Sequence, residues 1–381
     1  MDAPAAPATV PSLINWELAA STAARLAPAG PALGRKEIAA AVADLRIMAD
    51  RAVAHVHDIT GLEAARDLRD SQVLVVDRAS WAKANTQSFS VMLGSTLERL
   101  AAKQLETGKG AGLAVSGTVT GAQLGTVLAF LASKVLGQYD PFAALAGGAG
   151  SAPGGRLLLV APNILAVERE LNVDPADFRL WVCLHEQTHR VQFAAAPWLR
   201  HHMISEIDKL GGLLMGDAEN FSQRITAALR SMGGRLPGTA AGGQAASDRL
   251  PSRGGLLELL QDPAEKAALS HLTAVMSLLE GHANVVMDAV DASIVPTVKT
   301  IRQRFNSRGK DRGSVEKVIR RLLGLDAKMR QYSDGAAFVR SVVAAVGMEG
   351  FNRVWDAEEN LPTEAEIHNS RLWVERMGLR G

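Results

Sequence analysis

Segment 174–197 restricts the fold of this chain more than any other, because it carries the start and stop signals of one helix. Asp174 can accept a hydrogen bond from the first turn, and Pro175 suits the first helical position. Asp177 places a negative charge near the positive end of the helix dipole. A proline two residues after Ala195 cannot continue the helix. We therefore predict a helix from Pro175 to about Ala195.

Two histidines four residues apart lie in this helix, and a glutamate follows the first: the motif is His185, Glu186, Gln187, Thr188 and His189. Because four residues make slightly more than one turn, both imidazole rings project from one face and can bind one Zn²⁺. Glu186 can hold a water at the metal and act as its general base. Apolar residues precede the histidines on the same face, which should point into the protein: Phe178, Trp181 and Val182. The alternative is that these residue types stand at this spacing by chance, but a chance occurrence need not fall on a capped helix.

A catalytic zinc ion takes a third protein ligand, and the candidate is Glu280, in a helical pattern over about 256–290. Glu280 falls on an apolar stripe, where a buried carboxylate needs a compensating charge such as a metal ion: Leu272, Met276, Ala283 and Met287. Gly281 follows in mid-helix, and close approach of another backbone would explain it. Two alternatives remain. Glu280 could pair with an arginine, or His282 could be the ligand, although it points about 200° of helix rotation away.

Two supporting roles also have candidates. Asn284, one turn after Glu280, can accept the free N–H of a zinc-bound histidine and orient its ring, and Asp288 is the alternative. An oxyanion that develops during hydrolysis needs a hydrogen-bond donor, and Tyr332 is our candidate because Tyr139 lies in a predicted loop. Weaker candidates for this role are Lys328, His201 and His202. The alternatives are that Asn284 is an ordinary buried amide and that Tyr332 is a half-buried tyrosine without a catalytic role.

The composition favours a mainly helical fold. Hydrophobic residues make up 47% of the 381 residues and aromatic residues only 4%, which suits helices packed closely on small side chains. The apolar run 156–160 is the best strand candidate. We predict one domain over residues 13–375, with three parts: an N-terminal helical lobe (about 13–136), a linker (137–155), and a metal-binding lobe (156–375) that contains a flexible insertion (231–255).

Polar residues interrupt the apolar segment 112–136, so we predict a buried helix there and no membrane span. Its glycines at 117, 121 and 125 share one face and let another helix approach closely. Cys183 is the only cysteine, so the fold needs no disulfide, and the N-terminus lacks the basic and apolar regions of a signal peptide. We therefore expect a cytoplasmic protein.

The charges indicate which partners to expect. With 41 basic and 40 acidic residues the formal charge is +1, so no strong field attracts nucleic acid or anionic lipid. Segment 302–321 is rich in basic residues, but Phe305 is its only aromatic residue, which favours a solvated loop and helix start over a nucleic-acid contact. The expected partner is a peptide or small amide substrate, with no nucleic acid and no membrane. The oligomeric state stays open.

Six motifs are spread over about residues 13–375: INWELA, LLLVAPNI, HEQTHRVQF, LEGHA, KMRQYSDG and GFNRVWDAEENLPTEAEI. Together they resemble the zincin-like metallopeptidase type 2 family, whose actinobacterial members are described as associated with deazaflavin coenzyme biosynthesis. The resemblance implies a mostly helical, zincin-like fold with a small β element beside the HExxH helix. By analogy with Glu-type zincins, where a motif like LEGHA supplies the third ligand, it favours Glu280 over His282. Some Glu-type zincins have Asp four residues later, where this chain has Asn284.

Three functions fit these residues: a zinc metallopeptidase, an amide or ester hydrolase linked to deazaflavin coenzyme metabolism, or an inactive zinc-binding scaffold. Glu186 argues against the scaffold, because a structural zinc site needs no base and closes with a fourth protein ligand. We expect the exposure of strand 156–160 to distinguish the metallopeptidase from the amide or ester hydrolase. An exposed edge beside the zinc favours a peptide bound by strand addition, and a covered edge favours a smaller substrate or an inactive role.

Overall fold

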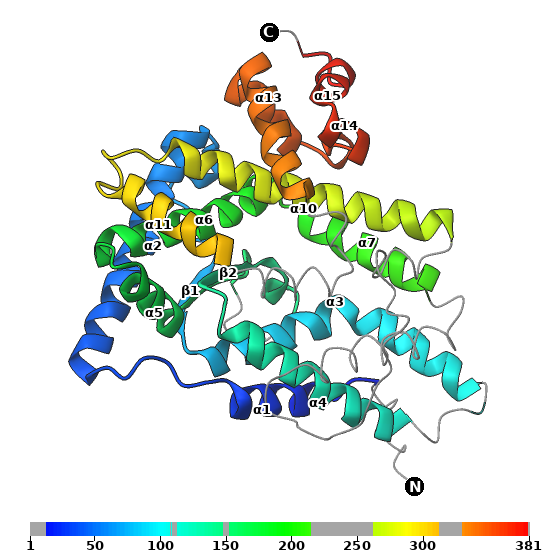
Figure 1. Ribbon diagram of the computed structural model, residues 1–381. Coiled ribbons are helices and arrows are strands. Elements are labelled where there is room, and N and C mark those ends of the chain that lie inside the picture. Colours follow the sequence, from blue (N-terminus) through cyan, green and yellow to red (C-terminus); the bar gives the residue numbers. More distant parts are fainter. Residues whose placement is uncertain are drawn as a thin grey trace, which may run out of the picture.

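The computed structural model describes residues 13–106, 108, 113–147, 152–214, 262–311 and 330–379, and the insertion predicted at 231–255 lies outside them. The described chain is mostly helical, which confirms the predicted fold class (Figure 1). Its α-helices are α1 (Trp16–Leu26), α2 (Arg35–Thr60), α3 (Arg78–Glu106), α4 (Leu113–Ala132), α5 (Ala161–Leu171), α6 (Pro175–Ala195), α7 (Leu199–Leu214), α10 (Pro263–Ala289), α11 (Val298–Asp311), α13 (Arg330–Asn352), α14 (Glu364–His368) and α15 (Ser370–Arg376). Its strands are β1 (Gln72–Val76), β2 (Gly137–Asp140) and β3 (Arg156–Val160).

The strands form one small sheet in the order β1-β3-β2. Strand β3 is parallel to β1, with Gln72 opposite Arg156, and antiparallel to β2, with Gly137 opposite Leu159. The strand predicted at 156–160 is therefore confirmed, but it is the central strand of the sheet. The expectation that it could be an exposed edge is wrong, because both of its sides are paired. Strand β1 lies in the predicted N-terminal helical lobe, and strand β2 lies in the predicted linker.

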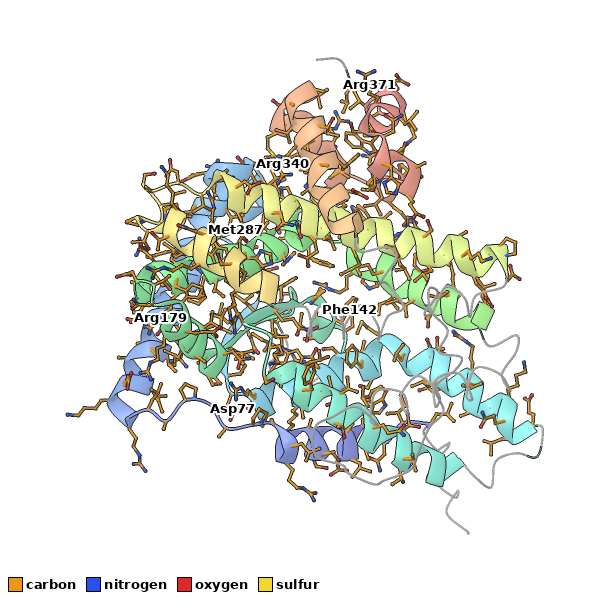
Figure 2. All side chains as sticks on the ribbon, viewed as in Figure 1. Asp77, Phe142, Arg179, Met287, Arg340 and Arg371 are labelled. Carbon is orange, nitrogen blue, oxygen red and sulfur yellow. The ribbon has the colours of Figure 1, made fainter. Side chains whose placement is uncertain are left out.

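Two hydrophobic cores lie on opposite faces of this sheet, because successive side chains of a strand point to opposite sides. Leu157 and Leu159 of β3 belong to the first core, with residues of α2, α5, α6, α10 and α13. Phe142 and Met287, labelled in Figure 2, are part of it. Leu158 and Val160 belong to the second core, with residues of α1, α3 and α4. The sheet thus lies between two helical layers (Figure 1).

Helix α2, from the predicted N-terminal lobe, packs directly on α6 from the predicted metal-binding lobe. The side-chain amide of Gln187 on α6 donates to the carbonyl oxygen of Ala49 on α2 at 2.7 Å. The buried thiol of Cys183 contacts the carbonyl of Leu45. Contacts between α2 and α6 therefore join the two predicted lobes and hold the helix that carries the HExxH motif in place.

Helix α4 packs closely on α1, as its regularly spaced glycines predict. A Cβ atom at Gly121 would lie 2.5 Å from the carbonyl oxygen of Asn15, and one at Gly125 would lie 2.5 Å from that of Ala19. Only glycine permits this separation. Within the described residues, no helix combines the length and the apolar character that crossing a membrane requires.

Candidate metal centre

Helix α6 begins and ends where its sequence signals predict. It spans Pro175–Ala195, and Oδ1 of Asp174 accepts the main-chain N–H of Asp177 at 3.0 Å. Phe178 and Val182 are buried on the face that leads to the histidines. This cap and apolar face place the HExxH motif on a rigid helix inside the protein.

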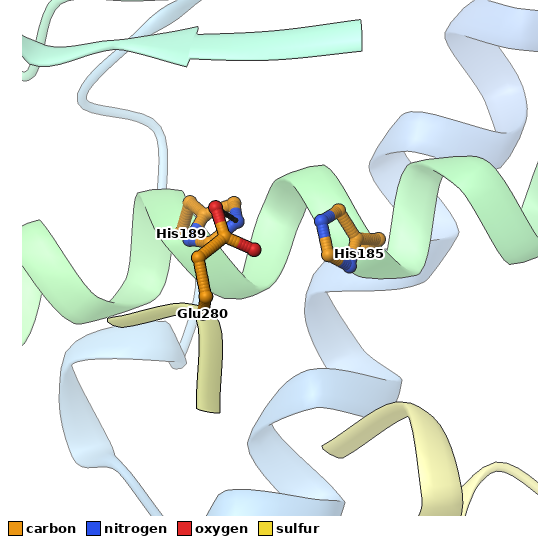
Figure 3. A group of neighbouring side chains, drawn as sticks. All are labelled: His185, His189 and Glu280. Carbon is orange, nitrogen blue, oxygen red and sulfur yellow. Dashed lines mark ion pairs between the residues drawn. The ribbon is translucent and has the colours of Figure 1, made fainter. Parts of the chain in front are cut away.

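His185 and His189 of α6 and Glu280 of α10 converge on one point (Figure 3). One ligand atom from each of the three lies within 4.8 Å of the others, close enough for all three to hold one metal ion. The two imidazole rings are 4.9 Å apart between centroids, with their planes at 89°. Nε2 of His189 lies 3.7 Å from Oε1 of Glu280. The structure thus brings together three side chains that the sequence predicted as a set.

Glu280 does not lie on the buried stripe of α10 that the sequence predicted. Met276 and Asn284, one turn before and after it, are exposed, and the Glu280 side chain is 31% exposed. Ala283 and Met287 of the predicted stripe are buried, as are Val275 and Leu279 on the neighbouring face. Glu280 therefore borders the solvent-accessible side of the helix, where it meets the histidines. Glu280 as third ligand stays a prediction, and the packing argument for it is only partly right, because Met276 and Glu280 are not buried with Ala283 and Met287.

The contact made by Gly281 explains which face of α10 points toward α6. A Cβ atom there would lie 2.3 Å from the carbonyl carbon of Gly335 in α13, and a Cβ at Gly335 would lie 2.0 Å from the carbonyl oxygen of Ser277. The close backbone approach expected at Gly281 is therefore confirmed. Because this contact turns the Gly281 face of α10 toward α13, Glu280 is left beside α6.

Glu186 lies apart from the three converging residues and is only 7% exposed. Its carboxyl group packs on β2, where a Cβ atom at Gly137 would lie 2.9 Å from its Oε1. Burial and, to a smaller extent, the charge of Glu280 together raise the pKa of Glu186 to about 8, against the opposing effect of a hydrogen bond from the main-chain N–H of Tyr139. This carboxyl can therefore hold a proton near neutral pH.

His185 is electrostatically suited to remain neutral. Burial and, to a smaller extent, nearby His189 together lower its pKa to about 4, and Glu280 opposes the shift. A neutral imidazole keeps a lone pair on one nitrogen, which is the form that binds metal ions. The ligand set thus combines imidazole nitrogen with carboxylate oxygen, a donor set typical of zinc.

Gln192 lies beside His189 in the position that was predicted for Asn284. Its Oε1 is 3.0 Å from Nδ1 of His189, whereas Asn284 is exposed. Asn284, which was predicted to accept the free N–H of a zinc-bound histidine, lies on a face of α10 that points outward, and at His189 Gln192 is the partner. The spacing of three residues within one helix was a signal for Gln192 that the sequence analysis missed.

His282, the rival third ligand, lies behind Gln192. Its ring is fully buried, its Nδ1 is 3.0 Å from Nε2 of Gln192, and its centroid is 5.2 Å from that of Phe351. Burial lowers its pKa to about 3. His282 is not part of the group of three that could hold a metal ion.

The sequence matches the family described as zincin-like metallopeptidase over residues 14–374. The chain belongs to this family. Among solved structures, the crystal structure of "a putative hydrolase with a novel fold" from Chloroflexus aurantiacus is 31% identical, with a TM-score of 0.63. The alignment covers 97% of this chain and 100% of that one. No curated protein matches the chain.

Membership of the zincin-like metallopeptidase family confirms the resemblance predicted from the six motifs. The family implies a metal ion, usually zinc, and the three converging residues are where this chain could hold one. The likeness to a structure described as a hydrolase points in the same direction. Neither comparison bears on a link to deazaflavin coenzymes.

Among the candidates for oxyanion stabilisation, Tyr332 falls within α13, but its side chain lies outside the described residues, as does Lys328. His202 is engaged elsewhere, with Nε2 2.8 Å from Nε2 of His271 and Nδ1 3.0 Å from Glu358. Tyr139 lies in β2 and not in a loop, and its hydroxyl donates to the carbonyl of Gly154. The role of Tyr332 stays a prediction.

Basic residues in the first part of segment 302–321 contact the protein itself. Nη2 of Arg302 donates to the carbonyl oxygen of Val290 at 2.8 Å, and Nη1 of Arg304 donates to that of Leu171 at 2.9 Å. These arginines attach α11 to the ends of α10 and α5. Residues 312–321 of the segment lie outside the described residues.

Proposed function

We propose that this chain is a zinc-dependent hydrolase, most naturally a metallopeptidase, with His185, His189 and Glu280 as zinc ligands and Glu186 as general base. One observation carries the proposal. Nitrogen and oxygen donors from two helices meet within 4.8 Å, and a separate buried carboxyl lies directly after the first histidine. Three protein ligands are the number typical of a catalytic zinc site, which keeps its fourth position free.

The residues of the site have distinct tasks in such a reaction. When bound, zinc supplies Lewis acidity that polarises a carbonyl group and lowers the pKa of a water molecule. Glu186 accepts the proton of the attacking water and then donates it to the leaving group, as a carboxyl with a raised pKa can do. The N–H of Tyr139 holds the Glu186 carboxylate in place while it changes its charge.

An edge strand beside Glu186 bears on whether the substrate is a peptide. The N–H of Val160 donates to the carbonyl of Leu136, and in an antiparallel pair such contacts alternate along the strand. The main-chain groups of Gly137 and Tyr139 therefore point away from β3. Strand β2 has no further partner strand among the described residues, but the outward N–H of Tyr139 already donates to Glu186 and Asp140 is buried, so only the Gly137 end is free to pair with an extended peptide. Strand β3 (156–160) itself is paired on both sides, which is the outcome that favours a smaller substrate or an inactive role.

The first testable prediction concerns Glu186→Gln. The amide keeps the shape of the side chain but cannot take a proton, so zinc content and thermal midpoint should stay close to those of the wild type. Hydrolysis should fall at least about 100-fold. Metal analysis, thermal unfolding and cleavage of a peptide library check the three expectations side by side.

The matched control is Glu366→Gln, which changes a buried carboxyl in the capping box of α14, away from the metal centre. It should lower the thermal midpoint and leave hydrolysis intact. Activity that survives Glu186→Gln would mean that another group is the base. A zinc-loaded wild type that cleaves no peptide would favour a smaller amide or ester substrate, or the inactive scaffold.

A further inference from the structure

Gln192 is a fully buried polar residue that connects both helices of the metal centre. Its Oε1 lies 3.0 Å from Nδ1 of His189 on its own helix α6. Its Nε2 lies 2.8 Å from the carbonyl oxygen of Leu279 and 3.0 Å from Nδ1 of His282, both on α10. Every polar atom of the side chain is therefore in contact with a partner.

The backbone carbonyl of Leu279 decides how the amide of Gln192 is oriented. A carbonyl oxygen can only accept a hydrogen bond, so the NH₂ group of Gln192 must be the group that faces it. The amide oxygen then faces His189. That oxygen also can only accept, so Nδ1 of His189 carries a hydrogen atom.

We propose that Gln192 is a positioning residue that holds His189 in the tautomer with its proton on Nδ1, so that Nε2 is free to bind the metal. This inference rests on the zinc site proposed above. In a neutral imidazole only one nitrogen carries a proton, so the lone pair is on Nε2. Nε2 is also the atom that lies 3.7 Å from Oε1 of Glu280. The tautomer thus points the lone pair of His189 at the other ligands.

His282 has a different role from the one the sequence suggested for it. The second hydrogen of the Gln192 amide is directed at Nδ1 of His282, which accepts it. The ring of His282 is held between Phe351 and Trp355, with centroids 5.2 and 5.4 Å away. Phe351 and Trp355, near the C-terminal end of the described chain, therefore hold the ring of His282 in place. His282 in turn helps to orient the Gln192 amide that contacts His189.

Nitrogen-15 NMR of the metal-free protein tests the tautomer without any activity measurement. The spectrum is recorded at about pH 8, where the protonated and bare ring nitrogens of a neutral histidine have well separated shifts. Wild-type His189 should show the proton on Nδ1. Gln192→Met removes donor and acceptor at similar volume, and should release the proton to either nitrogen and weaken zinc binding about 10- to 100-fold. Gln192→Glu keeps an acceptor and should restore the Nδ1–H tautomer.

Gln187→Met is the matched control, because Gln187 is an equally buried amide of α6 that faces Ala49 of α2. It should leave the tautomer of His189 unchanged and lower zinc affinity less than Gln192→Met does. A wild-type His189 with its proton on Nε2 would overturn the inference, as would equal loss of affinity in the two Met variants. A wild type with the Nδ1–H tautomer and no affinity for zinc would instead refute the proposed function while the assignment of Gln192 stands.

Discussion

Two carboxyl groups of the metal centre differ in their surroundings, and the difference assigns their tasks. Glu280 is 31% exposed and lies 3.7 Å from a histidine nitrogen. Glu186 is enclosed by β2, and its pKa is raised to about 8. A buried carboxyl group with a raised pKa is suited to proton transfer, and a carboxylate beside histidine nitrogens is suited to metal binding. We therefore assign metal binding to Glu280 and proton transfer to Glu186.

The third-ligand assignment predicts an order of effects. Glu280→Gln removes the anionic ligand and should lower zinc affinity more than His282→Ala, which disturbs the site only through Gln192. Isothermal titration of zinc into the three metal-free proteins measures the order. If His282→Ala is the more damaging change, His282 is the ligand, and the arrangement around Gln192 must be different from the one described.

The residues of this centre were predictable to different degrees. His185, Glu186 and His189 follow from spacing within one helix, which local geometry dictates. Glu280 was predicted from an apolar stripe that is buried only in part, and the resemblance of LEGHA to a family motif favoured it over His282. Gln192 was missed because its role depends on Leu279, a residue far away in the sequence.

At the level of elements, helix α6 was predicted to its terminal residues because its signals are local: an Asp cap, a proline at the start and a proline after the end. Strands β1 and β2 were not predicted. Their pairing is decided by β3, which is distant along the chain from β1. The polar sequence GQYD of β2 also resembles a turn, and it forms a strand because β3 offers a free edge beside α6.

The contact between α10 and α13 leads to a prediction that runs against helix propensity. Gly281→Ala should destabilise the protein by about 1–3 kcal/mol, although alanine is the better helix former, because its methyl group meets the backbone of Gly335. Gly94→Ala, in α3, meets nothing within 4 Å and should stabilise by up to about 1 kcal/mol. Urea unfolding of both variants gives the two free energies. Equal stabilisation by both changes would show that α10 and α13 do not approach so closely.

At the scale of the whole molecule, the metal centre depends on segments from the entire described chain. Helix α2 supports α6 through Gln187, and β2 encloses Glu186. The α13 backbone at Gly335 sets the face of α10 that carries Glu280, and Trp355 packs on His282. This agrees with a family match that spans residues 14–374. A fragment that contains the HExxH helix alone would lack Glu280 and the strand beside Glu186.

Because the proposed ligands come from α6 and α10, a bound metal ion should stabilise the whole fold. An ion that binds only the folded state adds about 4 kcal/mol when its free concentration is about 1,000-fold above Kd. Removal of zinc by a chelator should therefore lower the thermal midpoint by several degrees, and added zinc should restore it.

His185→Ala should unfold near the midpoint of the metal-free wild type, and the chelator should not change its midpoint. His201→Ala, which changes an exposed histidine of α7, should keep the full response. Calorimetry of the three proteins with and without zinc measures these shifts. A wild type that loses its metal without any change in midpoint would show that the ion does not join the two helices, and a ligand set within α6 would then have to replace the one that includes Glu280.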